Sequence, residues 1–143
     1  MNILIVEKTP ARGAMLAILL ERLGWQATCT TSAPDALAAL DARPFSGILL
    51  NLDIPGNEVL SVPVYAGYRQ PDACIVVLTE SGLFNDGSIF RLCSNACAFM
   101  GSSDRPEDIV AVLDHHARRG APVRTPAWRV RAAPGSRAAG SPG

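Results

Sequence analysis

The chain has 143 residues, of which 48% are hydrophobic and 18% are charged. This is the size of one domain with a buried core, and the composition excludes a chain that is disordered throughout. No apolar run approaches the ~18 residues that cross a bilayer, and residues 1–6 lack the features of a signal peptide, so we expect a cytoplasmic protein.

The charge is distributed unevenly along the chain. Residues 1–116 hold seven bases and all thirteen acids, a net charge of −6, whereas residues 117–143 hold six arginines and no acid. An acidic body followed by a basic tail is a first indication of function.

Buried strands alternate with amphipathic helices. Strands are predicted where aliphatic residues run together, over residues 2–6, 25–30, 47–51, 73–78 and 96–100. Helices are predicted where apolar residues recur at helical spacing, over residues 10–23, 33–42 and 84–93, with a last one ending at Gly120. Their expected caps are Thr9, Ser32, and either Ser103 or Asp104. A helix before the fourth strand must be short, kinked or begin near Pro63.

Five such units predict a doubly wound parallel sheet with helices on both faces. The functional crevice of this architecture lies at the carboxyl ends of the strands. The residues that follow those ends are Glu7 and Lys8, Asn51, Thr79, and Gly101 and Ser102. Residues 121–143 have no periodic apolar face, so we predict a domain over residues 1–120 and a flexible tail over 121–143.

Four stretches at these positions resemble the receiver domain of bacterial response regulators, the CheY-like family. They are residues 3–8, 49–56, 71–79 and 96–100, and the resemblance covers residues 2–118. It implies a flavodoxin-like sheet with strand order 2-1-3-4-5 and a role in two-component or chemotaxis signalling.

The resemblance also assigns the positions of the phosphorylation pocket. Typical receivers have two acids after the first strand, an acceptor Asp after the third, Thr or Ser after the fourth and Lys after the fifth. Those positions are held here by Glu7, Lys8, Asn51, Thr79 and Ser102. Phe99 falls at the position of the switch aromatic.

These substitutions predict a pocket that cannot be phosphorylated. A carboxamide such as Asn51 cannot supply the nucleophile of an acyl phosphate, and Ser102 carries no cation to hold a phosphoryl group. An ammonium from Lys8 about 4 Å from Mg²⁺ would repel it by ~8 kcal/mol at an effective dielectric near 20. We therefore expect no metal and no cofactor.

Two arrangements of Lys8 stay open. Its ammonium occupies the metal position, pairing with Glu7 or bonding Asn51 and Thr79, or it points to solvent. Asp53 is disfavoured as a substitute acceptor, since it lies two positions past the strand end in a loop without a prepared cation site.

Other chemistry-bearing residues have structural interpretations. Free, buried or half-buried thiols are expected for Cys29, Cys74, Cys93 and Cys97 because no metal-binding spacing is present. His115 and His116 cannot share a helix face, and His116 continues an apolar stripe. No phosphate-binding glycine loop is found.

The tail carries planar cations around one aromatic ring. Trp128 is flanked by Arg118, Arg119, Arg124, Arg129 and Arg131, and such groups bind phosphates and stack on nucleobases. The layout is similar to CheY-like proteins that bind cyclic di-GMP through an arginine-rich extension. Docking to an acidic protein or membrane surface, or no function at all, are the alternatives.

We therefore predict a pseudo-receiver, a non-catalytic adaptor that binds a protein partner without phosphorylation. In receivers the partner face is formed by the fourth helix, the fifth strand and the fifth helix, here parts of residues 89–93, Phe99 and residues 105–113. A cyclic di-GMP effector is the alternative function, and a homodimer is an open possibility. DNA binding is not expected because the acidic body repels phosphates.

Overall fold

A five-stranded parallel sheet forms the centre of the molecule. The computed structural model describes residues 1–54, 58–80 and 96–119. Its strands are β1 (Asn2–Val6), β2 (Gln26–Thr30), β3 (Gly47–Asn51), β4 (Cys74–Leu78) and β5 (Ala96–Met100). All neighbours pair in parallel, in the order β2-β1-β3-β4-β5. The predicted strand order is confirmed.

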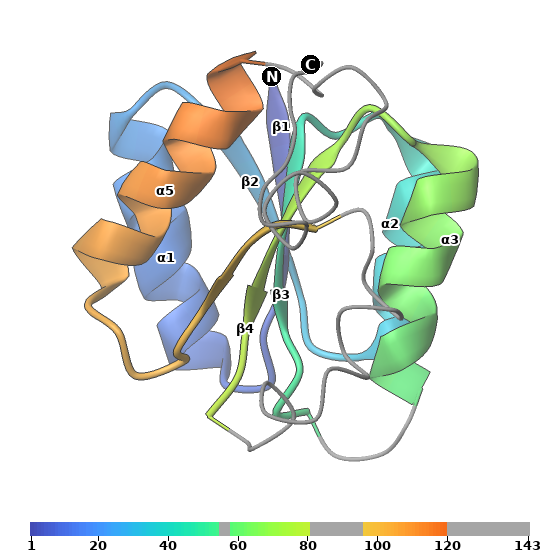
Figure 1. Ribbon diagram of the computed structural model, residues 1–143, viewed down its shortest axis with the longest axis horizontal. Coiled ribbons are helices and arrows are strands. Elements are labelled where there is room, and N and C mark those ends of the chain that lie inside the picture. Colours follow the sequence, from blue (N-terminus) through green and yellow to red (C-terminus); the bar gives the residue numbers. More distant parts are fainter. Residues whose placement is uncertain (55–57, 81–95, 120–143) are drawn as a thin grey trace, which may run out of the picture.

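Helices cover both faces of this sheet. They are α1 (Pro10–Arg22), α2 (Ala33–Ala42), the short 3-10 helix η1 (Glu58–Leu60), α3 (Ser61–Arg69) and α5 (Pro106–Arg119). Figure 1 shows α1 and α5 on one side of the sheet and α2 and α3 on the other. In the described part of the chain, no helix is long and apolar enough to span a membrane.

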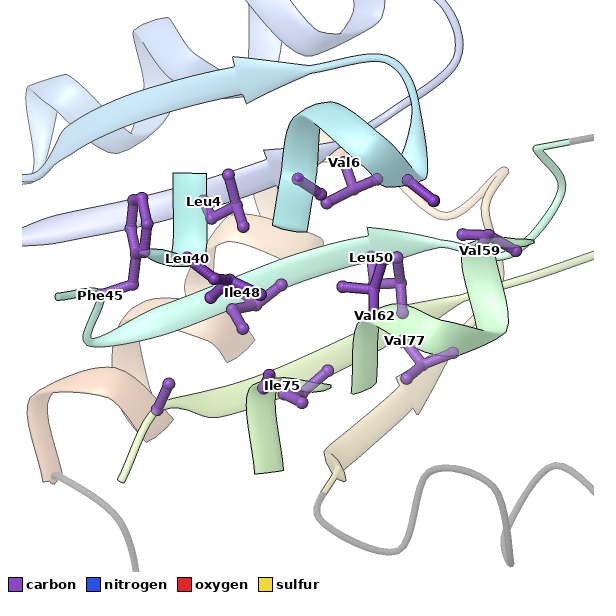
Figure 2. Packing of buried hydrophobic residues seen from close by; sticks show 14 of the residues in the cluster. Leu4, Val6, Leu40, Phe45, Ile48, Leu50, Val59, Val62, Ile75 and Val77 are labelled. Carbon is purple, nitrogen blue, oxygen red and sulfur yellow. The ribbon is translucent and has the colours of Figure 1, made fainter. Parts of the chain in front are cut away.

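Alternate residues of β1, β3, β4 and β5 enter two separate cores. Leu4, Ile48 and Ile75 pack beneath α2 and α3, as the close view in Figure 2 shows. Their neighbours Ile3 and Leu49 pack on the other face, beneath α1 and α5. Because both faces of these strands are covered, β1, β3 and β4 contain continuous aliphatic runs, whereas the edge strand β2 does not.

The predicted helix ends hold in most places. The Ser32 hydroxyl caps α2 by accepting a hydrogen bond from the Asp35 amide at 3.3 Å. Gly24 follows α1 with a φ of +97°, a conformation that glycine adopts without steric cost. Thr9 stands at the N-cap of α1, but its side chain makes no capping bond.

The remaining predicted helices agree with the structure at α3, differ from it at the start of α5, and lie outside the described residues at 84–93. α3 begins near Pro63, as one of the three alternatives had it, and η1 leads into it. α5 begins at Pro106, and the Arg105 carbonyl accepts from the amides of its first turn. The predicted caps Ser103 and Asp104 are therefore wrong, because the Asp104 carboxylate binds the Gly101 amide instead. The helix predicted over residues 84–93 and the tail lie outside the described residues.

The described cysteines differ in exposure. Cys74 is buried, Cys97 is half-buried and Cys29 is exposed. The expectation of a buried or half-buried thiol is thus wrong for Cys29, which lies on the edge strand β2. The pKa of Cys74 is raised by a hydrogen bond with the neighbouring Cys97 thiol and by burial, so Cys74 stays a neutral thiol. Cys93 lies outside the described residues.

Candidate functional site

Strand pairing brings the carboxyl ends of β3, β4 and β5 together. The strands run from the edge at which the N-terminus lies to the opposite edge (Figure 1). There the Leu52 amide donates to the Leu78 carbonyl at 2.8 Å, which extends the β3–β4 pairing past the end of β3. The Thr79 amide donates to the Met100 carbonyl at 3.1 Å. Asn51, Thr79 and the residues after Met100 consequently share one edge.

A buried polar pair lies at the bottom of this edge. Glu7 and Asn51 are each only 3% exposed. The Asn51 Nδ2 donates to Glu7 Oε1 at 2.9 Å, and Asn51 Oδ1 accepts the Asp53 amide at 2.8 Å. A carboxylate at position 51 could accept the second bond but could not donate the first. The carboxamide is thus the group that fits between Glu7 and the Asp53 backbone.

The charge of Glu7 is compensated from α1. The Arg12 Nε lies 3.5 Å from Glu7 Oε1, and the Thr9 amide donates to Glu7 Oε2 at 3.4 Å. A guanidinium nitrogen of Arg12 also donates to the Ser102 carbonyl. Arg12 therefore connects the ends of β1 and β5 while it neutralises a buried carboxylate, which would be costly to leave unpaired.

Asp53 folds back over the site. Its Oδ1 accepts the Thr79 hydroxyl at 3.1 Å, and its Oδ2 accepts the Ser102 hydroxyl at 2.8 Å. The Glu80 amide lies 3.3 Å from Oδ1 and 3.2 Å from Oδ2. Both carboxylate oxygens are therefore bonded to groups that follow β4 and β5.

Lys8 takes a third arrangement that the sequence alternatives did not include. Its side chain is exposed, and Nζ donates to the backbone carbonyl of Asp53 at 3.4 Å. The pairing with Glu7 is instead made by Arg12, and the Asn51 amide is directed at Glu7. The ammonium nevertheless lies at the strand-end edge, over the loop that follows β3.

The loop after β5 packs tightly on Glu80. The Ser103 amide donates to Glu80 Oε2 at 2.6 Å, and this bond, with a lesser contribution from the Ser103 side chain, lowers the pKa of Glu80. A Cβ at Gly101 would lie 3.0 Å from Glu80 Oε2 and 3.1 Å from Asp104 Oδ1. Gly101 thus allows the two loops to approach each other.

The predicted pocket residues lie close together at the strand-end edge, but the sequence analysis did not assign Arg12 and Asp53 as their bonding partners. Glu7, Asn51, Thr79 and Ser102 are all linked through Arg12 or Asp53. A sequence signal for both existed. Arg12 lies in the first turn of α1, which follows the end of β1, and Asp53 follows the end of β3 by two residues.

The switch position and the partner face are described in part. Phe99 is half-buried in β5, where it packs against the core beneath α2 and α3. On α5, Ile109 and Leu113 are buried, whereas Glu107 and Asp108 are exposed. His116 is half-buried, and its ring lies edge-on to His115 with the ring centroids 5.3 Å apart.

The structure places Arg118 in the folded body. Its guanidinium carbon lies 5.1 Å from the Trp25 ring centroid, and its Nε donates to Asp114 Oδ1 at 2.6 Å. It also donates to the Leu23 carbonyl, and the Trp25 Nε1 donates to the same Asp114 oxygen at 2.8 Å. Arg118 therefore has a structural role.

The other predicted tail residues are placed differently. Arg119 is exposed at the end of α5. Arg124, Trp128, Arg129 and Arg131 lie outside the described residues.

No family model matches the sequence, and no curated protein matches it. Among solved structures, a response regulator from Burkholderia pseudomallei is 25% identical, with a TM-score of 0.70 and an alignment covering 82% of this chain and 69% of that one. A CheY-like receiver domain from Methanospirillum hungatei is 23% identical, with a TM-score of 0.72 and coverages of 82% and 94%. The chain has the fold of a CheY-like receiver domain.

A third similar structure has the same fold and contains a magnesium ion. The receiver domain of a sensor histidine kinase from Pseudomonas aeruginosa, described with a magnesium ion coordinated in its active-site cleft, is 17% identical with a TM-score of 0.68. The alignment covers 82% of this chain and 97% of that receiver domain.

The donors of this chain's receiver fold do not fit a magnesium ion. Mg²⁺ needs anionic oxygens in octahedral geometry. The buried Glu7 carboxylate already faces Arg12 and the Asn51 amide, and Lys8 lies at the same edge. A divalent cation here would face the Arg12 guanidinium and the Asn51 NH₂ group, and the Glu7 and Asp53 carboxylates that it needs are already bonded to other groups.

Proposed function

We propose that the chain is a pseudo-receiver, a cytoplasmic signalling adaptor of a bacterial two-component or chemotaxis pathway that binds a protein partner without being phosphorylated. The fold supports a place in such a pathway, because two of the similar structures are a response regulator and a CheY-like receiver domain. The chemistry of the strand-end edge supports the absence of phosphorylation.

One observation carries this proposal. The group at the acceptor position is a carboxamide, and both of its polar atoms have partners in the buried network: Nδ2 bonds Glu7 and Oδ1 bonds the Asp53 amide. It lacks the negative oxygen that attacks phosphorus, and it cannot gain one by deprotonation. The Glu7 and Asp53 carboxylates of this edge are already bonded to Arg12, Asn51, Thr79 and Ser102, so the site offers poor ligands to the metal that would neutralise a phosphoryl donor.

The direct test is phosphorylation with a small donor. The full chain is incubated with acetyl phosphate and Mg²⁺, and its intact mass is compared with that of Asp53→Asn treated in the same way. We expect no adduct on either protein. A stoichiometric gain of about 80 Da, the mass of a phosphoryl group, on the wild-type chain would contradict the proposal. Loss of that gain in Asp53→Asn would show that Asp53 is the acceptor.

The partner face that we propose comprises Phe99 and residues 105–113, with parts of residues 89–93, which lie outside the described residues. The exposed acids Glu107 and Asp108 in the first turn of α5 outnumber the exposed Arg105, which pairs with Glu107 at 3.8 Å, so a basic partner surface is complementary to this face. Charge reversal, Glu107→Lys with Asp108→Lys, should abolish capture of that partner. Asp72→Lys, near the amino ends of the strands, serves as the matched control.

A second function, binding of cyclic di-GMP through the arginine-rich tail, has one structural observation in its favour. A hollow of about 480 Å³ lies where the exposed Arg119 ends α5, and Arg118, Phe45, Ser46 and Asp72 also line it. Calorimetric titration of cyclic di-GMP into the full chain and into Arg124→Ala/Arg129→Ala/Arg131→Ala tests this function. Heat from the wild type alone supports it, whereas equal, negligible heats exclude it.

A further inference from the structure

Asp53 is bound as a ligand would be. Two hydroxyls and one backbone amide, from Thr79, Ser102 and Glu80, converge on its carboxylate within 2.8–3.3 Å. Convergent neutral donors of this kind form an anion-binding site, because each places a partial positive charge toward one point. Here the anion is part of the chain.

The buried hydrogen bonds of Asn51 hold the Asp53 carboxylate in place. The Asp53 amide is bonded to Asn51 Oδ1, which the Glu7 bond fixes in turn. This side-chain-to-backbone bond, two residues apart, fixes the backbone turn that presents the Asp53 side chain to the donors. Asn51 therefore has two effects: it supplies no carboxylate nucleophile, and it positions Asp53.

Two cations lie at the periphery of the same site. Lys8 Nζ bonds the Asp53 carbonyl, and Arg12 bonds the Ser102 carbonyl. Both cations stabilise negative charge at the centre of the site, although neither bonds the Asp53 carboxylate in the described structure. The donors would therefore favour any small oxyanion that took the place of the carboxylate.

We propose that Thr79 Oγ1, Ser102 Oγ and the Glu80 amide form an oxyanion site that this chain fills with its own Asp53 carboxylate. The internal anion joins the loops after β3, β4 and β5 and so holds the end of the sheet that leads into α5 in one state. This inference rests on the proposed function, because it gives the reason that no phosphoryl group is needed to bring those loops together.

Amide hydrogen exchange at Glu80, followed by NMR on the full chain, tests the inference. In the described structure the Glu80 amide donates to the Asp53 carboxylate, so we expect protection of this amide to depend on Asp53. We expect exchange to accelerate at least about tenfold in Asp53→Ala, which corresponds to about 1.4 kcal/mol for one charge-assisted bond. The control Asp72→Asn, which removes an exposed carboxylate at the other edge, leaves the rate unchanged.

Inorganic phosphate is the probe for the emptied site. At concentrations up to 10 mM, without Mg²⁺ and at constant ionic strength, phosphate should slow Glu80 exchange again in Asp53→Ala and leave the wild type unaffected. If Glu80 exchanges at the wild-type rate in Asp53→Ala, the proposal that Asp53 acts as an internal anion is overturned. If Glu80 exchanges fast in Asp53→Ala and phosphate does not slow it, the proposal of an oxyanion site is overturned. If Asp53→Ala fails to fold, Asp53→Asn serves instead, with an expected acceleration of a few fold.

The two proposals fail in different experiments. A phosphoryl adduct on the wild type overturns the pseudo-receiver, whatever the exchange rate of Glu80. Unchanged exchange at Glu80 in the variants, without any adduct, overturns only the internal anion.

Discussion

Replacing Asn51 by Asp tests whether the buried pair is fixed as described. In the variant, two carboxylates would face each other where Nδ2 and Oε1 are now 2.9 Å apart, each on a residue only 3% exposed. At an effective dielectric of about 20, two unit charges at this distance repel by about 6 kcal/mol. The charged pair is therefore the less stable form.

The pair escapes this repulsion by binding one proton. A protonated carboxyl restores the donor that the Asn51 amide supplies, so the cost becomes that of protonation. At pH 7, about three units above the ordinary range of a carboxylic acid, this is about 4 kcal/mol, and at pH 5 it is about 1.4 kcal/mol. Arg12, with its Nε 3.5 Å from Glu7 Oε1, reduces both values somewhat.

The sign of the pH dependence follows from proton counts. The native variant binds one more proton than the unfolded chain between these pH values, so its stability relative to the wild type falls as pH rises. Urea unfolding of Asn51→Asp and wild type at pH 5 and pH 7, followed by the fluorescence of the buried Trp25, measures the difference.

Asn2→Asp is the matched control for this experiment. The Asn2 Nδ2 donates to the Pro44 carbonyl at 3.3 Å in an exposed position. Loss of this hydrogen bond should lower the free energy of unfolding by under about 1 kcal/mol. Equal costs for Asn2→Asp and Asn51→Asp, or a cost for Asn51→Asp that does not change with pH, would refute the described pairing of Asn51 with Glu7.

Three further predictions concern metal binding, the core and the surface. Combining Lys8→Asp with Asn51→Asp should create Mg²⁺ binding in calorimetric titration, whereas wild type gives no heat; equal binding by both would contradict the argument that the wild-type donors do not fit Mg²⁺. Leu50→Ala, at a side chain with no exposure, should lower the free energy of unfolding by about 2–5 kcal/mol, against under about 0.5 kcal/mol for the exposed Val64→Ala. The Tyr65 hydroxyl, with a lesser contribution from Arg69, lowers the pKa of Asp41, so Tyr65→Phe should raise that pKa in an NMR titration, and an unchanged pKa would refute the contact.

Much of the fold follows from local patterns. The aliphatic runs of β1, β3, β4 and β5 identify the strands because both faces of a parallel sheet are buried. Residue type favours Ser103 or Asp104 as the cap of α5, whereas the helix begins at Pro106. The structure uses the Asp104 carboxylate to bind the Gly101 amide, a choice that local sequence does not reveal.

The candidate site shows the same limit. Parallel topology makes the strand ends meet at one edge, so Glu7, Asn51, Thr79 and Ser102 could be assigned to one site before any coordinates. Lys8 was expected there or in solvent, but its bond to the Asp53 carbonyl depends on how the loop after β3 turns.

The sequence by itself determined the sheet, its polar edge and the loss of the acceptor carboxylate, because periodicity and residue type are properties of short segments. Only the tertiary structure decided which charges meet. Arg12 reaches the Ser102 carbonyl across 90 positions, and the Ser102 hydroxyl reaches Asp53 across 49. Bonds of this range depend on rotamers and loop turns that the packed elements impose, and no local pattern encodes them.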